Sequence, residues 1–160
     1  MLSALTTSDK INAVLLFVTA LGVTAAFWQL RAAARAQRAI FLKDLYLQLR
    51  TDPDVAHAYY LIEYDNFVYD EGFHGSELEP KLDRLLTVID LVCEMHLQNV
   101  ISKREMQFFH YQFRRVAQNA GVRSYLRFLN GIYAQSKLDH KPFCSFQAHS
   151  REDLAREYAA

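Results

Sequence analysis

The chain has 160 residues, 51% of them apolar and 22% charged, and its 18 basic and 18 acidic residues give a net charge of zero at pH 7. This composition excludes an intrinsically disordered chain, and five Gly with three Pro are too few for a loop-rich sandwich or barrel. Two Cys cannot form a disulfide framework. The sequence therefore predicts an all-α protein with one domain and a short additional segment.

The first predicted element is a single membrane-spanning helix over residues 11–30, INAVLLFVTALGVTAAFWQL, which contains no ionisable side chain. Twenty helical residues rise about 30 Å, the thickness of the bilayer hydrocarbon core. A buried core helix and a cleaved signal peptide are the alternatives. A retained anchor is favoured because a signal peptide has an apolar stretch of only about 7 to 15 residues and a positive excess before it. Gly22 and Ala26 form a small-xxx-small pair on which a second span could pack.

The distribution of basic residues predicts the orientation of this span. Only Lys10 precedes it, whereas Arg31, Arg35, Arg38 and Lys43 follow it. By the positive-inside rule, the N-terminus lies outside and the large C-terminal part in the cytoplasm, below the inner membrane. Anionic lipid headgroups are the expected partners of Arg31, Arg35 and Arg38.

Helix start and stop signals divide the rest of the chain. The span continues as one rod of roughly 40 residues to Arg50. Asp52 and Pro53 start a second helix that runs to Tyr69, ahead of a loop over residues 70–75. Capping boxes at Ser76/Glu79 and Ser102/Glu105 open a central helix and an aromatic-rich helix, and Gly121 ends the latter. A fifth helix follows from Val122, then a loop over 138–149 and a short helix over 150–157.

The expected domain organisation is therefore a cytoplasmic helical bundle of about five helices below a single span. It comprises a short extracytoplasmic N-terminus (1–10), the transmembrane helix (11–30), the bundle (31–137), and a loop with a short C-terminal helix (138–160). The span, the Arg-spaced helix, and the Leu85-Leu86 helix leading into Ile101-Ser102 resemble a broad set of small bacterial membrane-anchored helical proteins of unknown function. The resemblance implies the same topology and a bacterial origin, and it carries no catalytic residues.

Two thiols and two imidazoles have the composition of a structural zinc site. The four are Cys93 and His96, three residues apart on the central helix, and His140 and Cys144 in the C-terminal loop. Ordinary core packing is the preferred interpretation, because Cys93 and His96 lie on the apolar helix face. The same burial argues against Cys93 as a catalytic nucleophile, and no cofactor is expected.

Nucleic-acid binding is the main alternative function. Arg104, Phe108, Tyr111 and Arg115 form one stripe, and Arg123 and Arg127 align on the next helix. Residues 51–101 carry a net charge of −9 against +5 in residues 102–127, so internal neutralisation is preferred and nucleic acid is an unlikely partner. Asp83, Asp90 and Glu94 are the expected carboxylate partners of these arginines. The sequence thus predicts a non-enzymatic interaction or assembly module whose partner is another protein or a second copy.

Overall fold

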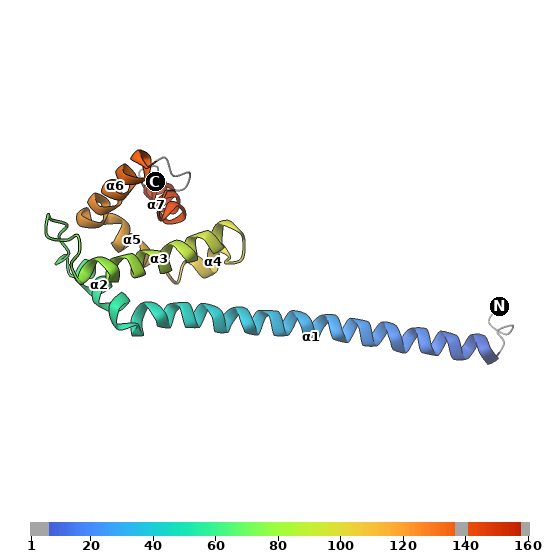
Figure 1. Ribbon diagram of the computed structural model, residues 1–160. Helices are drawn as coiled ribbons and strands as arrows, with labels where there is room; N and C mark the ends of the chain where they lie inside the picture. The colour runs from blue at the N-terminus through green and yellow to red at the C-terminus, as the bar shows by residue number, and fades with distance from the viewer. Residues whose placement is uncertain (1–6, 137–140, 158–160) are drawn as a thin grey trace. The chain divides into compact units, whose positions relative to one another are not determined.

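The computed structural model describes residues 7–136 and 141–157 (Figure 1). Within this part the chain is helical and has no strand, so the all-α prediction is confirmed. The helices are α1 (Thr7–Thr51), α2 (Pro53–Glu63), α3 (Leu78–Leu97), α4 (Lys103–Met106), α5 (His110–Gln118), α6 (Ala120–Gln135) and α7 (Cys144–Glu157). The chain forms two compact units, Met1–Asp44 and Leu45–Ala160.

Helix α1 contains the predicted apolar span and continues past it without a break, as expected for a single rod. The hydroxyls of Thr19 and Thr24 donate to the carbonyls of Leu15 and Ala20, each at 2.8 Å, so these polar groups are satisfied inside the helix. Among the described residues, this is one helix long and apolar enough to cross a membrane. Buried core helices and signal sequences meet the same length and composition test.

The core of the second unit is built around α3, which contacts α2 and α7. Its inward face consists of fully buried aliphatic side chains, Leu82, Leu85, Leu86, Ile89 and Val92. Burying one such side chain contributes roughly 1.5 to 3 kcal/mol relative to leaving it exposed. The apolar face expected for a central helix is therefore present, and α2 and α7 both pack against α3.

Of the three predicted N-cap residues, Asp52, Ser76 and Ser102, two are confirmed. Asp52 caps α2 by accepting from the backbone N–H groups of Asp54 at 3.0 Å and Val55 at 3.3 Å, with Pro53 in the first turn. Ser102 and Glu105 form a reciprocal capping box on α4. The box predicted at Ser76 is wrong, because Glu79 instead accepts from the Gly75 N–H at 2.7 Å and α3 starts at Leu78.

Several predicted boundaries are also wrong. Helix α2 ends at Glu63, and Phe67, predicted inside it, turns into the core from a loop. The predicted aromatic-rich helix is divided into α4 and α5. Gly121 does not end it: the break falls at Asn119, whose side chain accepts from the Val122 N–H at 3.0 Å and caps α6. Helix α7 begins within the loop predicted over 138–149.

Candidate functional site

The predicted zinc ligands are not brought together within the described residues. Cys93 is buried on α3, and the Nδ1 atom of His96 lies 2.8 Å from the Ile101 carbonyl oxygen. Cys144 is exposed at the start of α7, and His140 lies outside the described residues. No group of three or more His, Cys, Asp or Glu side chains in the described ranges is arranged to hold a metal ion.

The predicted nucleic-acid stripe is divided by contacts inside the domain. On α5, the Tyr111 hydroxyl donates to the Glu63 carboxylate. The Arg115 guanidinium lies 3.5 Å from Glu63 and 3.3 Å from Asp65. The Tyr111 hydrogen bond is the main cause that lowers the pKa of Glu63, so this carboxylate is ionised near neutral pH. Tyr111 and Arg115 therefore hold α5 to the C-terminal end of α2, while Arg104 and Phe108 remain exposed.

The prediction that Asp90 and Glu94 pair with arginines is wrong. Asp90 accepts from the backbone N–H of Phe146 at 2.8 Å, and Glu94 accepts from the Ser145 hydroxyl. Both contacts fall in the first turn of α7, where backbone N–H groups lack partners in their own helix and the helix dipole favours negative charge. These two carboxylates, one turn apart on α3, therefore fix the start of α7.

Asp83, the third expected partner of the arginines, accepts instead from the Tyr125 hydroxyl at 2.7 Å. The acidic helices do have basic partners, but different ones: Arg84 lies 2.9 Å from Asp54, and Arg115 binds Glu63 and Asp65. Desolvation raises the pKa of Asp83, and the Tyr125 bond opposes that shift.

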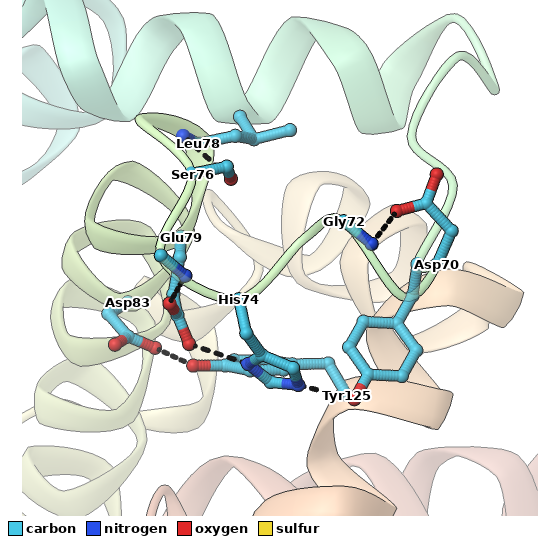
Figure 2. Close-up of polar contacts among 10 residues, drawn as sticks. Asp70, Gly72, His74, Ser76, Leu78, Glu79, Asp83 and Tyr125 are labelled. Carbon is cyan, nitrogen blue, oxygen red and sulfur yellow. Dashed lines mark hydrogen bonds and ion pairs between the residues drawn. The ribbon is translucent and has the colours of Figure 1, made fainter.

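A polar cluster that sequence reasoning missed surrounds His74 (Figure 2). Its Nδ1 atom lies 2.9 Å from Glu79 Oε1, and its Nε2 atom lies 2.8 Å from the Tyr69 hydroxyl. The arrangement resembles a carboxylate-imidazole-phenol relay. Burial raises the pKa of Tyr69 above its ordinary value, so its phenol stays protonated at neutral pH and does not serve as a nucleophile. The cluster instead fastens the loop before α3.

A second feature is a groove between α6 and α7 with a cavity of about 480 Å³. We call it the arginine groove after Arg123 and Arg127 on α6 and Arg151 on α7. The remaining lining residues are Ala117, Ala120, Ser124, Leu126, Asn130, Phe146, Gln147 and Ser150. Leu126 and Phe146 are buried and form an apolar part of the lining.

The polar side chains that line the arginine groove form hydrogen bonds within the domain. Asn130 Nδ2 donates to Gln147 Oε1 at 2.9 Å, and Gln147 Nε2 donates to the Pro142 carbonyl at 2.8 Å. Arg127 is anchored by its Nε atom to the Arg123 carbonyl at 3.3 Å and by Nη2 to Ser124 at 3.1 Å. These bonds use only part of the five N–H donors of Arg127.

The groove combines three guanidinium groups with no acidic lining residue. None of the three forms an ion pair with a carboxylate in the part of the chain that the structure describes. Such a site can hold an anion through charge-assisted hydrogen bonds. Sequence reasoning found Arg123 and Arg127 but missed Arg151, because its place beside them depends on how α3 holds α7.

Comparison with protein-family models, with curated proteins and with solved structures found no match to this chain.

Proposed function

We propose that this chain is a single-pass membrane protein whose second unit, Leu45–Ala160, is a cytoplasmic helical binding module rather than an enzyme. The observation that carries the proposal is the stretch 11–30 of α1, which has no ionisable side chain over the length of a bilayer. Among the described residues of the unit Met1–Asp44, no element other than α1 is present to cover these apolar side chains. A lipid environment would remove them from water.

The basic residues after the span support the orientation. Arg31, Arg35 and Arg38 would lie at the cytoplasmic headgroups, where each is worth about 1 kcal/mol near an anionic surface. The Arg31 guanidinium lies 5.4 Å from the centre of the Phe27 ring, an aromatic and cationic pair suited to a membrane interface.

A binding role is supported by the structural roles of the polar clusters in the second unit. Each cluster joins one element to another: Glu63 to Arg115, Asp90 to the start of α7, and His74 to Glu79. At the same time, Tyr64, Val68 and Phe108 are each more than two-thirds exposed, and exposed aromatic side chains are enriched at protein interfaces. These exposed side chains favour another protein or a second copy as the partner.

The proposal is tested by expressing the full chain with a reporter after Ala160 and separating membranes from the soluble fraction. We expect the chain to stay with membranes after alkaline carbonate washing, and the reporter to be active only in the cytoplasm. The double variant Leu16→Arg and Leu21→Arg should release the chain from the membrane, because each charge at the bilayer centre costs at least about 2.5 kcal/mol. Ile40→Arg, the same kind of change beyond the span, should leave it bound. A soluble wild-type chain, or a reporter active outside, contradicts the proposal.

A further inference from the structure

The arginine groove carries positive charge that no acidic side chain among its lining residues balances. Arg123, Arg127 and Arg151 line one cavity, and its other lining residues are neutral. Like charges held on the walls of one cavity repel one another, and they attract any anion that fits. We propose that the groove binds a phosphate monoester carried on an apolar organic group. This inference does not depend on membrane anchoring.

The choice of a phosphate follows from the number and shape of the donors. A phosphate monoester carries a charge of about −1.5 to −2 at neutral pH and three strong acceptor oxygens. Each guanidinium offers a planar fork of donors that matches two such oxygens. A carboxylate, with two oxygens and one charge, would use one arginine and leave the other two without a partner.

The choice of an organic carrier follows from the rest of the lining. Ala117, Ala120, Leu126 and Phe146 give the cavity an apolar part beside the arginines. The hydroxyl of Ser150 donates to the Phe146 carbonyl at 2.7 Å, and Asn130 and Gln147 bond to each other, so these neutral groups already have partners. A volume of about 480 Å³ also falls in the range of about 300 to 1,000 Å³ found for small-molecule sites.

Nucleic acid fits this unit less well. Residues 45–160 contain 13 basic and 16 acidic residues, a net charge of −3, whereas non-specific nucleic-acid binding depends on many phosphate contacts across a basic surface. Of the six residues first considered for nucleic acid, Tyr111 and Arg115 contact Glu63 instead. Three arginines lining one cavity suit a single anionic group better than the extended phosphate backbone of a nucleic acid.

The test uses the full chain in a non-ionic detergent and phenyl phosphate as the probe, followed by calorimetry and phosphorus NMR. We expect saturable binding, weaker binding of inorganic phosphate, and no binding of phenol. Arg123→Gln and Arg151→Gln should each weaken phenyl phosphate binding at least about tenfold, since a charge-assisted hydrogen bond contributes about 1.5 to 3 kcal/mol. Arg104→Gln, which removes the same charge from α4, should leave the affinity unchanged.

Both substituted arginines are exposed, so the folded state should survive, and circular dichroism with thermal unfolding checks this for each variant. If one variant unfolds, the other carries the test.

Nanodiscs with and without phosphatidic acid distinguish the two sources of a phosphate monoester. Displacement of phenyl phosphate assigns the site to a lipid headgroup, and retention assigns it to a soluble molecule. The proposal is overturned if phenyl phosphate does not saturate, if inorganic phosphate binds equally well, or if Arg104→Gln weakens binding as much. Tighter binding of a single-stranded oligonucleotide through Arg123 and Arg151 would replace it with nucleic-acid recognition.

Discussion

Gly121 shows how a single missing side chain lets two segments of the second unit meet. A Cβ atom added at Gly121 would lie 2.8 Å from two atoms of the Phe67 ring. Phe67 comes from the loop between α2 and α3 and is only 4% exposed. The sequence suggested that Gly121 ends a helix, but its role is to let this ring pack against the first turn of α6.

We expect Gly121→Ala to destabilise the second unit by about 1 to 3 kcal/mol, because the added methyl group overpacks a buried contact. Gly131 is a matched control in the same helix, since a Cβ there meets nothing within 4 Å. Gly131→Ala should stabilise the unit by about 0.5 to 1 kcal/mol through the higher helix propensity of alanine. Urea unfolding of both variants measures the two changes. Equal effects of the same sign would show that Phe67 is not held against Gly121.

At the scale of elements, helix caps that depend on neighbouring residues could be predicted from the sequence, whereas contacts between distant residues could not. Asp52 and Ser102 cap helices through neighbours two or three residues away, so their roles could be predicted from the sequence. Asp90 accepts a hydrogen bond from the backbone N–H of Phe146, 56 residues further along the chain. Nothing in the spacing around Asp90 distinguishes an acceptor for a distant helix start from the partner of an arginine. The arginine groove, which depends on this contact, could therefore not be predicted from the sequence.

The loop before α3 contains a carboxylate that makes the stability of the second unit depend on pH. The Gly75 N–H and the His74 side chain lower the pKa of Glu79 from its ordinary value of 4.5. A carboxylate with a lowered pKa in the folded state stabilises that state above its unfolded pKa, and this contribution is lost as the pH falls through the folded value. We expect the stability of the second unit to fall below about pH 4.5, and Glu79→Gln to remove part of that fall.

Chemical unfolding between about pH 3 and pH 7 measures this dependence. Glu77→Gln is the control, because Glu77 makes no side-chain hydrogen bond as the N-cap of α3. It should leave the pH dependence as in the wild type. A Glu79→Gln chain whose stability falls with acid as steeply as that of the wild type would show that the His74 cluster does not stabilise the loop.

At the scale of the whole molecule, the boundary between the two units falls inside α1 rather than at a helix end. Leu45 and Leu49, in the last two turns of α1, are buried in the second unit, at 5% and 3% exposure. Tyr46 beside them lies 6.4 Å from Phe109, ring centre to ring centre. The end of α1 is therefore part of the core of the second unit, even though the helix continues through the first.

This boundary predicts which fragments fold. A chain beginning at Lys43 keeps Leu45 and Leu49 and omits the apolar stretch 11–30, so we expect it to be soluble without detergent and to unfold cooperatively. A chain beginning at Thr51 loses both leucines. Because removing one buried leucine side chain costs about 2 to 5 kcal/mol, this shorter chain should be several kcal/mol less stable or remain unfolded. Urea unfolding followed by circular dichroism compares the two. If both fragments are equally stable, the end of α1 does not belong to the core; if the longer one dissolves only in detergent, its apolar surface is not confined to the span.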